Sequence, residues 1–290
     1  MSLISDKIVS QIKSEGYSCV ENAIKESEIN KKLSFLNNDN TKARGNYPVF
    51  FNQYLIKLLK FDFNKLKQTN ILNNIAKNLN LKEISDKFFN SESEMYMIDT
   101  YHSEKAEKDI IPWHNDIGLS NNDELKKRNV NQDQANKSFY ASSIATINNY
   151  YTGKSARGLK FFIYLTDVEK NNGSLAIIPS SNKIVHALTS LILERKIKLS
   201  PYWNLNNLRN LILNLEVNKL LKNKLGAALV DNFIQKTSFI TSSEKNTVDF
   251  DLPMKAGSMI IFDELCVHRG GPPKKNSRRV LRYIFRKKIN

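Results

Sequence analysis

The stretch IPWHNDIG, residues 111–118, places an imidazole and a carboxylate two positions apart, at His114 and Asp116, in a chain with only four histidines. In a β-strand, residues i and i+2 point to the same face, so a nitrogen donor and an oxygen donor would lie side by side. A second histidine on a neighbouring strand would complete the two-histidine, one-carboxylate set that binds Fe(II) in non-haem oxygenases. Taken alone, the pair is equally compatible with the polar edge of an ordinary strand.

His268 is the natural candidate for the second histidine. It closes a predicted strand, residues 258–268, at the point where a Gly-Gly-Pro-Pro turn begins. The other two histidines, His102 and His186, are expected on or beside loops, as surface residues that could contact a substrate. The sequence therefore predicts a metal site built from His114, Asp116 and His268.

Two basic side chains could add positive charge to such a site. Arg279 lies in the next predicted strand, where its planar guanidinium could bind a carboxylate through two hydrogen bonds. Strand alternation favours Arg279 over Arg278 and Arg282, which we expect to point outward. In the predicted strand 158–168, Lys160 lies on the same face as Phe162 and Tyr164. If that face lines the inside of a barrel, the Lys160 side chain would reach the site. Otherwise it is a lysine at the barrel mouth or on the surface.

The elements that must position these residues are mainly helical at first and mainly β-strand later. Apolar residues recur at helical spacing over residues 4–81 and again over about 186–236. The strand-like segments are rich in β-branched and aromatic residues. The segments 158–168 and 174–181, joined by the turn EKNNG, predict a β-hairpin. The other predicted strands are 94–102, 111–118, a candidate within 138–151, 246–254, 258–268 and 278–287.

Composition indicates a globular protein. The chain has 290 residues, of which 41% are hydrophobic and 10% aromatic, so it can bury a sizeable core. No repeat or linker separates domains, so we expect one α+β unit over residues 1–290. Its parts would be a helical front at 1–90 and a core at 91–290 that contains the helical insertion.

Charge and cysteine content limit the other functional classes. The net charge of +15 comes from scattered lysines, which favours a solvated surface over a nucleic-acid site and only weakly favours an anionic substrate. Cys19 and Cys266 form neither a disulfide framework nor a Cys-x-x-Cys zinc pattern, and both are expected to be buried thiols. Without a leader-like or membrane-spanning apolar run, we expect a cytoplasmic protein. Its oligomeric state stays open.

The sequence resembles the phytanoyl-CoA-dioxygenase-like family of Fe(II)/2-oxoglutarate-dependent oxygenases. The resemblance covers roughly residues 90–286 and an opening helix and strand. It rests on four segments in a fixed order, PWHND, FFIYLTDVEKNNGSLAIIPSSNK, KAGSMIIFDELCVHRGG and RRVLRYIFRK. It implies a double-stranded β-helix, the cupin-like jelly roll, with N-terminal helices and a helical insertion.

The resemblance also implies cofactors and roles. His114, Asp116 and His268 would bind Fe(II), and Arg279 would hold the distal carboxylate of the cosubstrate 2-oxoglutarate, to which Lys160 could add a charge. O2 would be the oxidant, and ascorbate is expected to stimulate the reaction.

The expected reaction is hydroxylation of an unactivated C–H bond of a small metabolite or natural-product intermediate, with release of succinate and CO2. The carboxylate at Asp116 favours hydroxylation over chlorination, because halogenating relatives need a small residue there. Desaturation and ring closure stay open, as does the question of whether the insertion is a lid or an interface. The alternative is a catalytically silent or differently metallated jelly roll whose basic surface binds an anionic polymer or a membrane.

Overall fold

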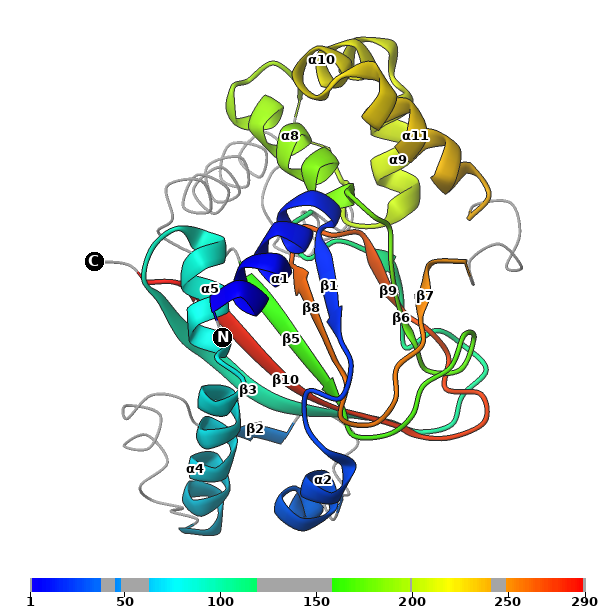
Figure 1. Cartoon of the computed structure of the whole chain (residues 1–290). Helices are drawn as coiled ribbons and strands as arrows, with labels where there is room; N and C mark the ends of the chain where they lie inside the picture. Colours follow the sequence, from blue (N-terminus) through cyan, green and yellow to red (C-terminus); the bar gives the residue numbers. More distant parts are fainter. Residues whose placement is uncertain are drawn as a thin grey trace, which may run out of the picture.

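Two antiparallel sheets form the centre of the protein (Figure 1). The computed structural model describes residues 2–37, 45–47, 63–118, 158–198, 200–240 and 249–288. Within these residues, the larger sheet contains, in spatial order, β1 (Tyr17–Val20), β8 (Met259–Asp263), β5 (Gly158–Tyr164), β10 (Arg278–Lys287), β3 (Ser93–Ser103) and β2 (Gly45–Tyr47). The smaller sheet contains β4 (Ile111–His114), β9 (His268–Gly270), β6 (Leu175–Ile177) and β7 (Asp251–Leu252).

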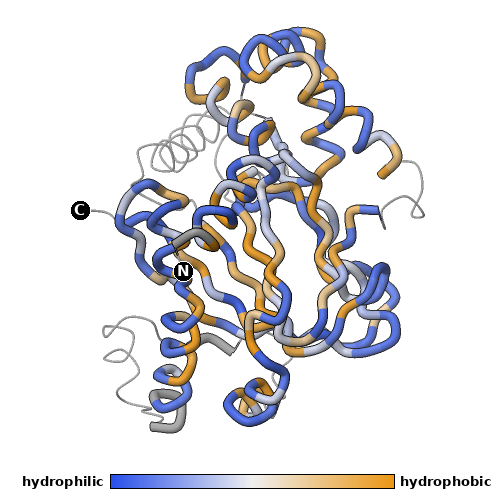
Figure 2. The backbone as a smooth tube through the Cα atoms, in the orientation of Figure 1, coloured by the Kyte–Doolittle hydropathy of each residue, from blue (hydrophilic) through white to orange (hydrophobic). Residues whose placement is uncertain are grey.

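This arrangement is the jelly roll that the sequence predicted. Apolar side chains of the two sheets meet in a buried cluster that includes Phe162 and Tyr164 of the larger sheet and Leu175 and Ile177 of the smaller one. Figure 2 shows that hydrophobic residues are concentrated along the central strands. Because alternate residues of a strand point to opposite faces, the neighbours of these residues face away from the space between the sheets.

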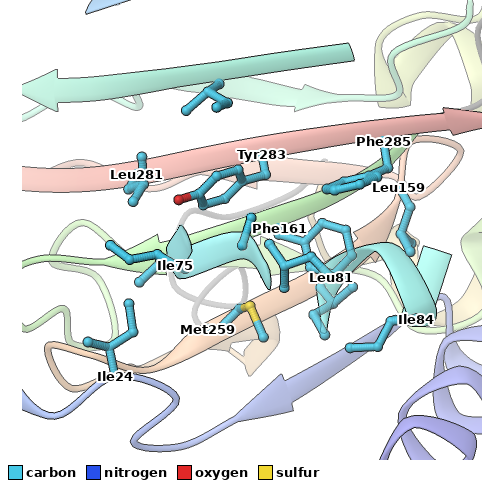
Figure 3. Packing of buried hydrophobic residues seen from close by; sticks show 14 of the residues in the cluster. Ile24, Ile75, Leu81, Ile84, Leu159, Phe161, Met259, Leu281, Tyr283 and Phe285 are labelled. Carbon is cyan, nitrogen blue, oxygen red and sulfur yellow. The ribbon is translucent and has the colours of Figure 1, made fainter. Parts of the chain in front are cut away.

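N-terminal helices cover the outer face of the larger sheet. They are α1 (Ser2–Glu15), α4 (Phe63–Asn78) and α5 (Leu81–Phe89), and a shorter helix, α2 (Glu26–Lys32), with the 3₁₀ turn Ser34–Asn37 lies near one end of the sheet (Figure 1). Figure 3 shows Tyr283 and Phe285 of β10 on the side of Leu81 of α5, and Leu281 on the side of Ile75 of α4, all within one apolar cluster. Both faces of β10 are therefore buried, one against the helices and the other against the smaller sheet.

The predicted helical insertion consists of α8 (Ser181–Leu193), α9 (Leu205–Leu213), α10 (Leu215–Leu225) and α11 (Ala227–Ser238). Two asparagines cap helices in it: the side chain of Asn204 accepts a hydrogen bond from the Asn207 amide, and that of Asn214 accepts two from the first turn of α10. The insertion packs on the outer face of the smaller sheet. It forms one apolar cluster there with Trp113 of β4, Ala176 of β6 and Val267, which directly precedes β9. It lies at one end of the molecule, at the top of Figure 1.

Two predictions about strand pairing are wrong. The segments 158–168 and 174–181 do not form a hairpin, because β5 pairs with β8 and β10, whereas β6 pairs with β7 and β9 in the other sheet. The predicted turn does exist, with Asn171 and Gly173 at positive φ, but it carries the chain between the two sheets. Residues 258–268 are likewise two strands, because a turn closed by the Cys266 amide and the Asp263 carbonyl separates β8 from β9.

The predicted strands 94–102 and 278–287 are confirmed as β3 and β10, and these two pair along their length. Only Asp251–Leu252 of the predicted strand 246–254 is extended as a strand in the described part. The candidate strand within 138–151 lies outside the described residues. Among the helices that the structure describes, none has the length and apolarity that crossing a membrane requires.

Candidate metal centre

The two histidines come from adjacent strands of the smaller sheet. His114 ends β4, His268 begins β9, and the two residues are direct partners in the antiparallel pairing, with ring centroids 4.3 Å apart. The His268 ring also lies 5.1 Å from the ring of Phe262, which belongs to the apolar cluster between the sheets. Strand pairing thus places both imidazoles at the inner face of the jelly roll.

Asp116 completes a compact group of three ligands. Its Oδ1 lies 3.8 Å from His114 Nε2, and its Oδ2 lies 3.6 Å from His268 Nε2. One ligand atom from each residue can be chosen so that all lie within 4.8 Å of one another, the one such His/Cys/Asp/Glu group found in the described part of the chain. Although Asp116 lies beyond the end of β4, it reaches the same side as His114, as the predicted alternation requires.

Hydrogen bonds orient both imidazoles toward the carboxylate. His114 Nδ1 lies 2.7 Å from the Pro112 carbonyl and His268 Nδ1 lies 2.8 Å from the Cys266 carbonyl. A carbonyl oxygen only accepts, so each Nδ1 carries the proton and donates it, which leaves each Nε2 with a free lone pair. This is the usual arrangement of histidines that bind a metal through Nε2.

The protonation states suit a divalent cation. Burial lowers the pKa of His268 to about 3 and also lowers the pKa of His114, so both rings are neutral near pH 7. Burial alone would raise the pKa of Asp116, but the nearby Lys160 ammonium outweighs it and holds that pKa well below its usual range. Two neutral nitrogens and one carboxylate match the donor set that Fe(II) takes in non-haem oxygenases.

Asn115 fixes the segment that carries the ligands. Its side-chain amide donates to the carbonyls of Tyr202 (2.7 Å) and Trp203 (3.2 Å), and its Oδ1 accepts from the amides of Ile117 and Gly118. The Trp203 ring lies 4.9 Å from the His114 ring. The segment before α9 therefore forms one wall of the site, a contact between distant parts of the chain that no local pattern indicated.

Lys160 lies at the site, which is one of the two placements that its strand parity left open. Its ammonium is 2.7 Å from Asp116 Oδ2 and 3.8 Å from Glu264 Oε1. Glu264 was not predicted, because a single glutamate after a strand has no distinctive spacing. Burial raises the pKa of Glu264, and Asp116 adds to that effect while Lys160 opposes it.

The structure does not bring Arg279 to the ligands. Arg279 shares a face with Leu281 and Tyr283, as predicted, but this face packs against the N-terminal helices. Arg278 and Arg282 instead lie on the face that looks between the sheets, so the prediction that they point outward is wrong. Their guanidinium carbons lie 5.6 Å and 5.5 Å from the ring centres of Tyr164 and Phe162, respectively.

Between Arg278 and Arg282, only Arg278 lacks a carboxylate partner among the described residues. Arg282 is neutralised by Asp99, with its Nε 2.7 Å from Oδ1 and its Nη2 bonded to Oδ2. Arg278 is 3% exposed and its Nε has no hydrogen-bond partner within the described chain. Burial lowers the pKa of its guanidinium.

Arg278 also lies on the same side of β9 as His268. Its Nη1 is 3.6 Å from the point where a side chain at Gly270 would begin, and Gly270 follows His268 by two residues on the same strand face. Two strand residues span about 6.6 Å. A buried guanidinium with no carboxylate partner in the described part of the chain suits a dicarboxylate that would bind the metal at one end and Arg278 at the other.

The remaining predicted residues lie outside this group. His102 belongs to β3 and pairs with Arg279 in the strand register, and His186 lies in α8. Trp113 is 7% exposed and packs in the core, as predicted. Of the two cysteines, Cys266 is buried and Cys19 is partly buried.

Two histidines and a carboxylate on the inner face of a jelly roll define a protein of the non-haem iron oxygenase type. The chain belongs to the phytanoyl-CoA dioxygenase (PhyH) family, whose model matches residues 12–280. This is the family of Fe(II)/2-oxoglutarate-dependent oxygenases that the sequence motifs indicated.

Solved structures with the same fold include several enzymes. The epimerase SnoN, in complex with Fe3+, alpha ketoglutarate and nogalamycin RO, has a TM-score of 0.52 and 10% identity, covering 99% of this chain and 85% of SnoN. HygX from Streptomyces hygroscopicus with iron bound has a TM-score of 0.52 and 10% identity, covering 98% and 87%. The carbocyclase SnoK has a TM-score of 0.50 and 11% identity, covering 97% and 83%. At these identities the similarity shows the fold. No curated protein matched the sequence.

Proposed function

We propose that this protein is an Fe(II)/2-oxoglutarate-dependent hydroxylase of a small molecule. The observation that carries the proposal is the convergence of His114 Nε2, His268 Nε2 and the Asp116 carboxylate, with both Nδ1 atoms already bonded to carbonyls. When bound, Fe(II) and 2-oxoglutarate supply the oxidising chemistry, in which O2 is consumed, 2-oxoglutarate becomes succinate and CO2, and the substrate gains a hydroxyl group.

Each residue at the site has a distinct task in this proposal. The three ligands would hold Fe(II) through two imidazole nitrogens and one carboxylate, the donor set that leaves coordination positions for the cosubstrate and O2. Arg278, and not Arg279, binds the distal carboxylate of 2-oxoglutarate, because its guanidinium is buried, faces the interior and has no carboxylate partner in the described chain. The Trp203 ring lies beside His114 and the Phe262 ring lies beside His268, and both rings keep water away from the imidazoles.

The position of the site favours a small-molecule substrate. The site lies inside a jelly roll next to a helical insertion, which suits a small molecule rather than a polymer. The structural relatives named above include an epimerase and a carbocyclase. Asp116 supplies a carboxylate where halogenating relatives need a small residue, so it favours hydroxylation, or the related desaturation or ring closure, over chlorination.

The test is an anaerobic titration of the metal-free protein with Fe(II) and then 2-oxoglutarate. We expect the visible charge-transfer band of the iron–2-oxoglutarate chelate, and succinate formation once air is admitted. His268→Ala should abolish both, whereas His102→Ala, a histidine outside the ligand group, should leave both unchanged. A wild-type protein with neither band nor succinate would contradict the proposal and favour a silent jelly roll that binds anions through its basic surface.

A further inference from the structure

Lys160 is held between two carboxylates at the edge of the metal site. Its ammonium donates to Asp116 Oδ2 at 2.7 Å, and Glu264 Oε1 lies 3.8 Å away. The side chains of Lys160 and Glu264 are only 9% and 8% exposed. A buried lysine of this kind is retained only if its charge is compensated, and here one of the compensating groups is a metal ligand.

Glu264 is anchored by the main chain of β5. Its Oε2 accepts a hydrogen bond from the Gly158 amide at 2.6 Å, and its own amide donates to the Gly158 carbonyl at 3.1 Å. A side chain at position 158 would begin 2.4 Å from the Glu264 carboxyl carbon, so it would displace the Glu264 carboxylate from this position. Gly158 therefore fixes Glu264, and Glu264 fixes the far end of Lys160.

The position of Lys160 makes it a poor partner for the cosubstrate. In the sheet register Lys160 lies opposite Ile284, while Tyr164, next to Arg278, lies opposite Val280. Lys160 and Arg278 are thus near opposite ends of the inner face of β5 and β10. One dicarboxylate stretched from the metal to Arg278 would extend away from Lys160.

We propose that Lys160, held by Glu264, is a positioning residue that makes Asp116 a one-oxygen metal ligand. This inference rests on the proposed function. Lys160 occupies Oδ2, so Oδ1, which faces His114 Nε2 at 3.8 Å, is the oxygen left for the metal. If both oxygens bound the metal, the carboxylate would take one of the coordination positions that 2-oxoglutarate and O2 require.

The test uses Co(II) alone, followed by 2-oxoglutarate, on Lys160→Met, with the exposed turn variant Lys170→Met as the matched control. Lys160→Met preserves length and removes the hydrogen bond. We expect its Co(II) affinity to rise about tenfold, because the ammonium 2.7 Å from Asp116 Oδ2 repels the dication and withholds that oxygen from it. We also expect its visible Co(II) spectrum to change as Asp116 binds through both oxygens. Lys170→Met should match the wild type in both measurements.

Glu264→Gln provides an independent variant, because glutamine keeps the bond to Gly158 and loses the charge that holds Lys160. It should shift the Co(II) spectrum in the same direction by a smaller amount, and it carries the test if Lys160→Met does not fold. An unchanged Co(II) affinity and spectrum in these variants, with weakened 2-oxoglutarate binding, would overturn the inference and make Lys160 a cosubstrate ligand. If wild-type protein binds no Co(II), the proposed function itself fails.

Discussion

The most discriminating prediction concerns the two neighbouring arginines of β10. Replacing Arg278 by Met should remove the charge that faces the interior, whereas replacing Arg279 by Met changes the face that packs against the helices. A hydrogen bond to a charged group contributes about 1.5–3 kcal/mol. Losing a two-pronged bond to a buried carboxylate should therefore weaken 2-oxoglutarate binding by about 3 kcal/mol, or roughly 100-fold in Kd.

The assay is the titration of the Fe(II)-loaded protein with 2-oxoglutarate, read from the charge-transfer band, for the wild type, Arg278→Met and Arg279→Met. Arg279→Met should change Kd by less than about threefold, the range of an indirect effect. The cosubstrate-free stability of Arg278→Met should not fall, because removing a buried charge that has no carboxylate partner in the described chain relieves a desolvation cost. If Arg279→Met strongly weakened 2-oxoglutarate binding while Arg278→Met bound it normally, the conclusion that Arg278 lies on the inner face of β10 would be refuted.

Two further predictions concern other buried groups. Burial raises the pKa of the Cys19 thiol from 9.0 to about 11. Near pH 8 its alkylation should therefore be about 100-fold slower than that of an unperturbed thiol. The folded state should also lose stability as pH rises from 9 toward 11, because the thiol of the unfolded chain ionises first. Mass spectrometry after timed alkylation checks this, and equal rates in folded and unfolded protein would contradict it. Asn115→Ala leaves the Tyr202 carbonyl without its side-chain donor, whereas the Trp203 carbonyl keeps the bond from the main-chain amide of residue 115, so the substitution should lower the free energy of unfolding by about 2 kcal/mol in chemical denaturation. A loss below about 0.5 kcal/mol would mean that water replaces the amide.

Residue type and spacing determined the metal ligands. His114, Asp116 and the motif ending in His268 were recognisable because few histidines exist in the chain and because i and i+2 side chains of a strand share a face. The same alternation correctly predicted that Lys160 accompanies Phe162 and Tyr164. These features are local, and local geometry depends little on how distant segments pack.

Strand partners were not determined by the sequence. The turn after Val168 is a genuine turn, yet β5 and β6 enter different sheets. Both strands are buried throughout, so neither shows the alternation that would indicate which sheet each joins. The supporting residues Glu264, Asn115 and Trp203 were missed for a related reason, since each acts through a contact with a segment far away in the chain.

The choice between Arg278 and Arg279 shows what only the tertiary structure decided. Alternation separates the two arginines onto opposite faces of β10, but it does not say which face is the inside. Helices cover one face and the smaller sheet covers the other, so apolar residues occur on both, such as Tyr283 on the helix side and Val280 between the sheets. Only the packing of the N-terminal helices on the larger sheet determines which arginine faces the metal site.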